Sequence, residues 1–132
     1  MEFVSIRIIT GDVARLVDFY ERATAVRANW ANEDFAELRT ASATLAIAST
    51  RTVPLLAPGS AHPADNRSII IEFLVDDVDS VHQNLTGFVQ DFVNEPTTMP
   101  WGNRALLFRD PDGNLVNFFT PVAPAAIEKF AR

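Results

Sequence analysis

Apolar side chains occupy every second position near the start of the chain, from Val4 through Ile6 to Ile8, with Ser5 and Arg7 between them. A period of two is typical of a strand with one buried face. We therefore expect a first strand whose apolar positions pack beneath a helix, while Ser5 and Arg7 point to the opposite side of the sheet.

The pattern changes to helical spacing directly after this strand. Asp12 follows a Thr-Gly turn as a helix N-cap, and apolar positions then recur every three or four residues from Val13 to Tyr20. This spacing predicts a helix over about residues 13–23. Short β-rich stretches predict three further strands, at residues 28–31, 35–39 and 44–49.

A proline-containing stretch without a sustained period, at about residues 51–67, is expected to be a linker between a first module at 1–50 and a second at 68–121. After it the same order of elements begins again. The second half predicts strands at residues 68–75, 88–93, 105–109 and 115–120, a helix from Val78 to Leu85, a tight turn at 110–114, and a C-terminal helix within 122–132.

The two halves align when the chain is shifted by about 65 residues, a shift that places Arg7 on Glu72 and the cap Asp12 on Asp77. The burial pattern and the cap position agree between the halves. We therefore expect two βαβββ modules. A unit of roughly 60 residues cannot easily cover its own sheet, so the modules should share one structure.

Composition narrows the functional classes. The chain has 132 residues and no cysteine, which indicates one domain and excludes disulfides, thiolate metal sites and cysteine nucleophiles. Eleven Lys and Arg against seventeen Asp and Glu give a net charge of −6, which argues against nucleic-acid or anionic-membrane surfaces and favours a cationic ligand. Without a membrane-spanning apolar run or a cationic signal segment, we expect a soluble cytoplasmic protein.

Several motifs add a family resemblance. They are Asp12 followed by Phe19-Tyr20-Glu21, the stretch FLVDDVD at 73–79, MPWG at 99–102 and FRDPDGNL at 108–115. Together with the two modules, they resemble the vicinal oxygen chelate superfamily of glyoxalases, bleomycin-resistance proteins and extradiol dioxygenases. The resemblance covers about residues 3–121. It implies an α+β fold in which two tandem βαβββ modules form a cupped eight-stranded mixed sheet, with helices outside, a ligand cavity inside and a homodimeric assembly.

The resemblance also implies where a metal would be held, on the inner faces of the first and last strand of each module. In this chain those positions are Ser5, a small residue (Ala46 or Ala48), Ile70 and Asn117. A hydroxyl, a methyl, an aliphatic chain and an amide make a poor donor set for a divalent ion. We therefore expect no metal and no other cofactor.

Strand parity predicts which side chains face the cup, and Arg7 and Glu72 are expected to meet there, either as a structural ion pair or as a polar anchor for a ligand. Small side chains at Thr44, Ala46 and Ala48 leave room. Aromatic side chains near strand ends or in loops are candidates for the walls, with ordinary core packing as the alternative. The predicted ligand-binding residues are Ser5, Arg7, Trp30, Phe35, Glu72, Trp101, Asn117 and Phe119, and no catalytic residue is identified.

Three functions fit these observations. The first is metal-free binding or sequestration of a small molecule, cationic or aromatic. The second is a lyase, isomerase or dioxygenase of the same superfamily that uses a divalent metal or Glu72 and Arg7. The third is a structural or regulatory domain with an unused cavity.

Overall fold

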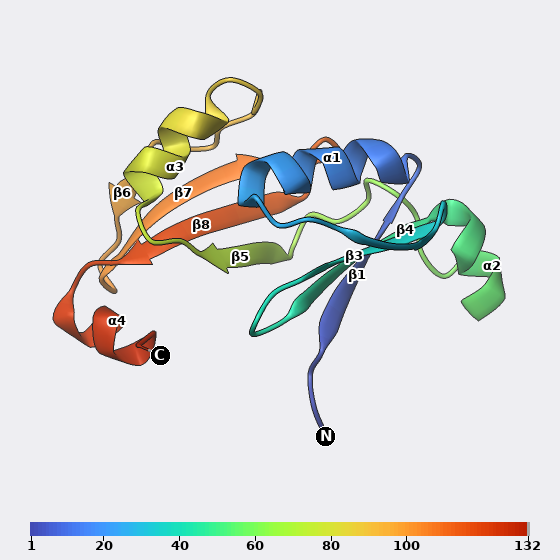
Figure 1. The fold of residues 1–132 in the computed structure, drawn as a ribbon, viewed down its shortest axis with the longest axis horizontal. Coiled ribbons are helices and arrows are strands. Elements are labelled where there is room, and N and C mark those ends of the chain that lie inside the picture. Colours follow the sequence, from blue (N-terminus) through green and yellow to red (C-terminus); the bar gives the residue numbers. More distant parts are fainter. Residues whose placement is uncertain (132) are drawn as a thin grey trace. The chain divides into compact units, whose positions relative to one another are not determined.

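The computed structural model describes residues 1–131, which divide into two compact units that meet in sequence between Asn66 and Arg67. Each unit contains a four-stranded mixed sheet with its elements in the order β-α-β-β-β (Figure 1). The predicted α+β class and its two modules are thereby confirmed. Among residues 1–131, none of the helices combines the length and hydropathy that crossing a bilayer requires.

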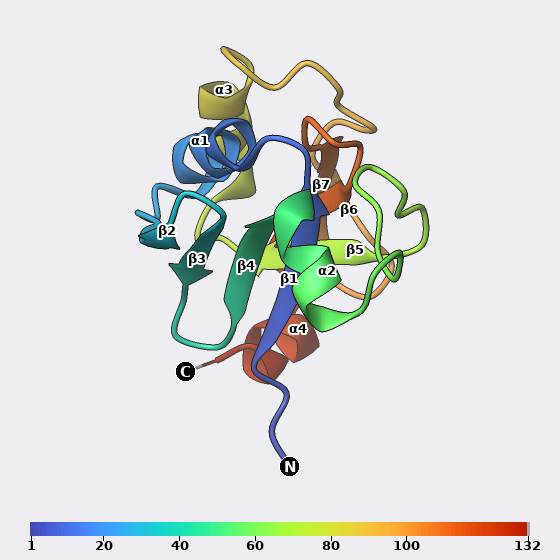
Figure 2. The same ribbon diagram turned by 90° about the vertical axis from the view of Figure 1, so that its right-hand side faces the viewer.

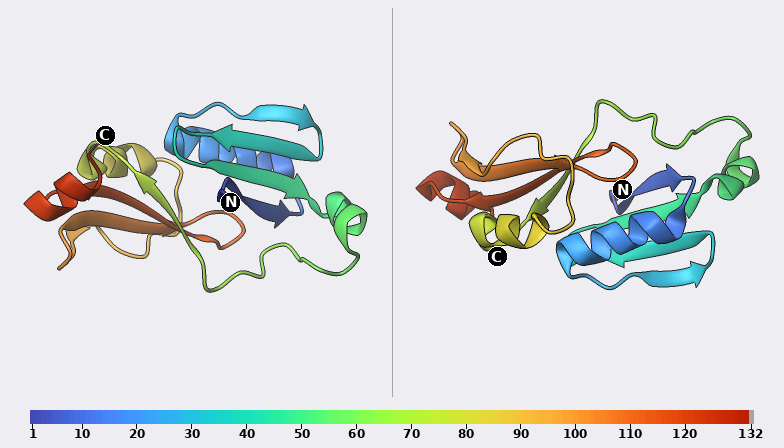
Figure 3. Two further views of the ribbon diagram at one scale, coloured as in Figure 1. Left: turned by 90° about the horizontal axis from the view of Figure 1, so that it is seen from below. Right: turned by 90° about the horizontal axis from the view of Figure 1, so that it is seen from above.

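The first unit orders its sheet β1-β4-β3-β2, with β1 parallel to β4 and the other neighbours antiparallel (Figure 2). Its elements are β1 (Ser5–Thr10), α1 (Val13–Thr24), β2 (Asn29–Asn32), β3 (Phe35–Arg39) and β4 (Thr44–Ser49). The crossover from β1 to the parallel strand β4 includes α1, which lies along one face of this sheet (Figure 3).

The ends of α1 are defined by local chemistry. The Asp12 side chain accepts a hydrogen bond from the Arg15 amide at 3.1 Å, and Ala25 closes the helix in the left-handed conformation with φ 59°. The apolar side chains at helical spacing, among them Leu16 and Tyr20, are buried. This face of the helix packs on β3 and β4.

The alternation in β1 is borne out for Ile8 but not for Val4. Ile8 is buried on the side of the sheet that α1 covers, whereas Val4 precedes the first residue of β1 and is 62% exposed. The prediction that Val4 packs beneath the helix is therefore wrong, because the strand begins one residue later. The segment expected to be a linker begins with a 3-10 turn, η1 (Thr50–Thr52), and a single helical turn, α2 (Val53–Leu56).

The second unit orders its sheet β5-β8-β7-β6, with β5 parallel to β8. Its elements are β5 (Ile70–Leu74), α3 (Val78–Leu85), β6 (Thr97–Thr98), β7 (Asn103–Arg109), β8 (Leu115–Pro121) and α4 (Pro124–Lys129). The β7–β8 turn forms as predicted. The Asp110 carboxylate accepts the amides of Asp112 and Asn114, each at 2.9 Å, and Gly113 has the positive φ of 83° that the turn needs.

The predicted strand at residues 88–93 is wrong. Only Phe92 forms a bridge to Phe108, and the regular pairing with β7 comes later, at the two-residue β6. Between them the Asn94 side chain takes the place of a backbone partner, because its Oδ1 accepts the Leu107 amide at 2.7 Å. The β-rich composition of residues 88–93 therefore predicted a strand where the chain runs along β7 without continuous backbone pairing.

The C-terminal helix α4 is shorter than expected and is attached to the start of β7. The amides of Val122 and Ala123 both donate to the Gly102 carbonyl, at 2.9 and 3.0 Å. Beyond α4, the Phe130 ring packs edge-on against Phe119, with 5.0 Å between the ring centroids.

Candidate functional site

In each unit, the candidate residues lie on the face of the sheet that its long helix leaves uncovered, called here the helix-free face. Strand register defines the residues on it, because directly paired residues point to the same side of a sheet. In the first unit they are Ser5, Arg7, Ile9, Phe35, Glu37, Arg39, Thr44, Ala46 and Ala48. In the second they are Ile70, Glu72, Leu74, Asn103, Ala105, Leu107, Arg109, Leu115, Asn117, Phe119 and Pro121.

In the first unit, Arg7 reaches across β4 to an aromatic ring on β3. Its guanidinium carbon lies 4.9 Å from the centroid of Phe35, within the range of a cation–π contact. The two strands are separated by β4, so the side chain spans roughly 9–10 Å of sheet. Ala46, which pairs directly with Arg7, and Ala48, which pairs with Phe35, are small enough to let it pass.

The charged groups on this face differ in their partners. Arg39 forms an ion pair with Glu37, with 3.0 Å between Nη2 and Oε1. Arg7 has no carboxylate partner within the described residues of the first unit, where its guanidinium contacts the Phe35 ring. Ser5 lies two residues before Arg7 at the start of β1 and is exposed.

In the second unit, two predicted site residues form a pair. The Asn117 amide nitrogen donates to Glu72 Oε2 at 2.8 Å, directly across the β5–β8 register. The Asn117 amide oxygen is buried and accepts no hydrogen bond within the described residues. A buried amide oxygen without a hydrogen-bond partner is uncommon in folded proteins, and a regular sheet does not create one.

The register confirms that Arg7 and Glu72 hold equivalent positions in the repeat. Each is the third residue of its strand, and each lies opposite the third residue of the parallel partner strand, Ala46 in one unit and Asn117 in the other. The neighbour decides what the charged side chain does. Alanine lets Arg7 extend to an aromatic ring, and asparagine holds Glu72 by a hydrogen bond.

Three of the four aromatic residues predicted to bind a ligand are not available on a helix-free face: two lie outside it and one is covered. Trp30 pairs with Ala36, so its register position is on the face that α1 covers, at the edge strand, where it is 46% exposed. Trp101 is 68% exposed in the turn between β6 and β7. Phe119 is on the helix-free face but only 7% exposed, with Phe130 packed on it. Phe35 is the aromatic residue that shares a face with another predicted site residue, Arg7.

The positions at which the family resemblance implies metal ligands do not fit a metal ion. Ser5, Ala46, Ile70 and Asn117 offer only two possible donor groups, one hydroxyl oxygen and one amide oxygen. These groups bring no negative charge to offset the dehydration of a divalent cation. Within residues 1–131, no three His, Cys, Asp or Glu side chains converge as a metal site would need.

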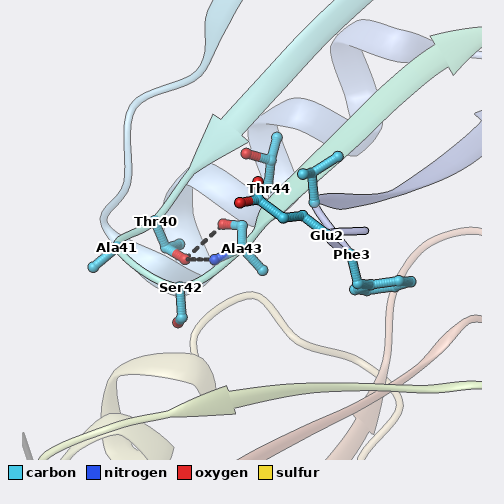
Figure 4. Close-up of a pocket in the computed structure, with 8 residues that line it drawn as sticks. Glu2, Phe3, Thr40, Ala41, Ser42, Ala43 and Thr44 are labelled. Atoms are coloured by element: carbon cyan, nitrogen blue, oxygen red, sulfur yellow. Dashed lines mark hydrogen bonds between the residues drawn. The ribbon is translucent and has the colours of Figure 1, made fainter.

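A shallow depression of about 500 Å³ lies at one end of the first sheet, between the N-terminal segment and the β3–β4 turn (Figure 4). It is lined by Glu2, Phe3, Val4, Thr40, Ala41, Ser42, Ala43 and Thr44. The Thr40 hydroxyl uses its hydrogen bonds within the turn itself, donating to the Ala43 carbonyl at 2.7 Å. The lining is almost entirely exposed and offers no buried polar group, so this depression is not the candidate site.

Sequence reasoning missed two charged clamps. Asp34 accepts hydrogen bonds from the Ser49 hydroxyl at 2.8 Å and from Arg51 Nε at 2.7 Å, which lowers the pKa of Asp34 below its usual value. In the second unit, Arg104 donates two hydrogen bonds to Asp79 and lowers the pKa of that carboxyl group. The partners are 15 to 25 residues apart, so no local pattern signals them. The first clamp joins the β2–β3 turn to the end of β4 and to η1, and the second joins the first turn of α3 to the start of β7, so both are structural.

Comparisons with known proteins agree with this geometry. The family described as "Glyoxalase/Bleomycin resistance protein/Dioxygenase superfamily" matches residues 2–118. A solved glyoxalase/bleomycin resistance protein/dioxygenase family enzyme from Burkholderia phytofirmans PsJN is similar with a TM-score of 0.80 and 16% identity, over 92% of this chain and 100% of that one. One from Nocardioides has a TM-score of 0.76 and 18% identity, over 94% and 85%.

Among curated proteins, the uncharacterized protein YraH of Bacillus subtilis (strain 168) is 22% identical over 125 residues, which are 90% of this chain and 98% of that protein. A solved protein of unknown function from Agrobacterium tumefaciens str. C58 has a TM-score of 0.79 and 23% identity, over 92% and 95%. These likenesses establish a shared fold and leave the chemistry to the residues of the site.

Proposed function

The chain belongs to the glyoxalase/bleomycin resistance protein/dioxygenase superfamily, and from this premise we propose that it binds a small organic molecule without the help of a metal ion. The observation that carries the proposal is the Glu72–Asn117 pair on the helix-free face of the second sheet. It combines a carboxylate and an amide with aliphatic neighbours, which is the composition of a binding surface for a small molecule.

The metal-dependent alternative is disfavoured by the chemistry of the donor set. A divalent ion polarises substrate oxygens only when several O or N donors hold it around an open position. Here Ile70 and Ala46 offer no donor at two of the four family positions, and Ser5 and Asn117 offer only a neutral hydroxyl and a neutral amide oxygen at the other two. Glu72 alone would have to provide nearly all of the attraction.

Metal content and ligand binding test this proposal together. We expect the purified protein to contain no stoichiometric divalent metal and to gain no thermal stability from added zinc, nickel, manganese or iron(II). We expect members of a fragment library to raise the unfolding temperature equally with and without EDTA, because ligand at 100 times its Kd stabilises by about 2.7 kcal/mol.

Elemental analysis that finds about one metal per chain, lost in Glu72→Ala, would contradict metal-free binding and favour the enzymatic alternative. A library in which no fragment shifts the unfolding temperature would instead favour the structural or regulatory alternative. The matched control for the first result is Glu33→Ala, which removes an exposed carboxylate in the β2–β3 turn.

A further inference from the structure

The helix-free face of the second unit carries a hydrogen-bond acceptor that the fold leaves unused. A carboxylate can only accept hydrogen bonds, so Asn117 must turn its N–H side toward Glu72, as the 2.8 Å contact shows. This orientation fixes the other side of the amide. Its Oδ1 is buried without a hydrogen bond among the described residues, which is unfavourable because burial removes the water that would otherwise donate to it.

Glu72 supplies a second acceptor, directly across the β5–β8 register from Asn117. Glu72 is exposed, and its other oxygen, Oε1, makes no hydrogen bond or ion pair within the part of the chain that the structure describes. The nearest arginine in register on this face, Arg109, donates through Nη1 to the Gly113 carbonyl at 3.0 Å, at the β7–β8 turn. The pair therefore presents two oxygen acceptors and one negative charge.

Resting on the proposed function, we infer that Glu72 and Asn117 bind an organic cation that carries N–H donors, of the primary ammonium or amidinium class. One N–H donates to the Asn117 amide oxygen and another to the Glu72 carboxylate. The positive charge of the ligand is balanced by Glu72, and hydrogen bonds between charged groups are about twice as strong as neutral ones. The net charge of −6 on the chain also draws a cation toward it.

The surroundings indicate that the cation has a hydrocarbon part. Along β5, Ile70 and Leu74 flank Glu72 at a distance of two residues, roughly 7 Å on each side. Their side chains are 46% and 36% exposed, so they offer apolar surface on which a ligand can lie. Leu107 lies directly opposite Asn117 on β7. An inorganic cation would gain nothing from these aliphatic neighbours, whereas an alkyl or aryl ammonium would be partly desolvated by them.

Three probes that share a benzyl group separate charge from hydrogen bonding by a cationic N–H. Benzylammonium has both the charge and N–H donors, benzyltrimethylammonium has the charge without N–H donors, and benzyl alcohol has no charge. We expect the wild-type protein, followed by NMR of backbone amides on β5 and β8, to bind benzylammonium at least tenfold more tightly than benzyl alcohol. We expect benzyltrimethylammonium to be intermediate.

Two substitutions assign the preference to the pair. Glu72→Gln removes the charge and keeps an oxygen that can accept from Asn117, so it should abolish the preference of benzylammonium over benzyl alcohol. Asn117→Leu removes the amide acceptor and keeps the carboxylate, so it should reduce the advantage of benzylammonium over benzyltrimethylammonium without abolishing it. Glu33→Gln makes the same chemical change at an exposed turn and should leave all three affinities unchanged. Thermal unfolding checks that each variant is folded.

The outcomes separate this inference from the function on which it rests. Equal affinities for the three probes, or a preference that persists in Glu72→Gln, would overturn the assignment of the cation to this pair. If neutral fragments from the library still bind the protein in that case, metal-free small-molecule binding stands while the ligand class is wrong. If no library fragment binds at all, the proposed function fails as well.

Discussion

At the scale of the residue, the two sheets show how one register position takes on different chemistry. Arg7 and Glu72 are equivalent in the repeat, yet Arg7 is held by an aromatic ring and Glu72 by an amide. The difference follows from the residue opposite, Ala46 or Asn117. A small neighbour opens a path across the sheet for a long side chain. A polar neighbour instead holds the side chain by a hydrogen bond at the adjacent strand.

The Asp34 clamp makes a prediction about pH. A hydrogen bond from Ser49, the larger cause, and one from Arg51 lower the pKa of Asp34 in the folded protein below the ordinary 3.8. A carboxyl group with a lowered pKa in the folded state stabilises the fold above its unfolded pKa, and this contribution is lost as the pH falls through the folded value. We therefore expect Asp34→Asn to be less stable than wild type at pH 7, and the gap to close below pH 3.8.

Urea denaturation between pH 7 and pH 3 measures this gap directly. Asp18→Asn is the matched control, since it removes an exposed carboxylate from α1 that takes part in no hydrogen bond or ion pair of the described residues. If the difference in free energy of unfolding between wild type and Asp34→Asn stays constant over the whole pH range, the charge of the Asp34 carboxylate does not contribute to stability.

At the scale of the element, α4 depends on a glycine before β7. Gly102 has φ +94°, and a Cβ placed there would lie 2.6 Å from the Ala123 Cβ and 3.2 Å from the Ala126 Cβ. Both Ala123 and Ala126 belong to the segment that begins α4. A side chain at residue 102 would therefore force the helix away from the strand.

We expect Gly102→Ala to lower the free energy of unfolding by about 2–4 kcal/mol, the sum of backbone strain and overpacking. Gly59→Ala is the control, because Gly59 also has a positive φ, of 74°, but nothing lies within 4 Å of its Cβ position. It should show only the strain, about 1–2 kcal/mol. Equal losses in the two variants, measured by urea denaturation, would mean that contact with α4 contributes nothing.

At the scale of the whole molecule, exposed edges and apolar side chains favour self-association. β2 pairs only with β3 and all four of its residues are exposed, so its outer backbone groups are free to pair with another chain. Leu55 and Leu56 on α2 are also largely exposed. Exposed strand edges and apolar groups of this kind are typical of protein interfaces.

We expect a homodimer, which sedimentation at micromolar concentration would detect as a species of twice the 14.6 kDa chain mass. The dimer should persist in 1 M salt if apolar contacts hold it, because salt screens charged contacts and strengthens apolar ones. A single species of 14.6 kDa would contradict the expectation.

The sequence by itself determined the elements whose signals are local. Period-two alternation, helical spacing, the caps at Asp12 and Asp77 and the turn around Gly113 each depend on neighbouring residues, and the structure has all of them close to their predicted positions. Parity also placed Arg7, Glu72 and Asn117 on the helix-free faces, because alternation is a local property of a strand.

Only the tertiary structure decided what depends on residues far apart in the chain. It showed that β7 is flanked by an irregular segment with the Asn94 side chain as a partner, that Phe130 covers Phe119, and that Asn117 turns its amide nitrogen toward Glu72. Composition cannot predict these contacts, since each joins residues 11 to 45 positions apart and depends on register and on which side chains meet. The unused amide oxygen of Asn117 is a consequence of such a contact.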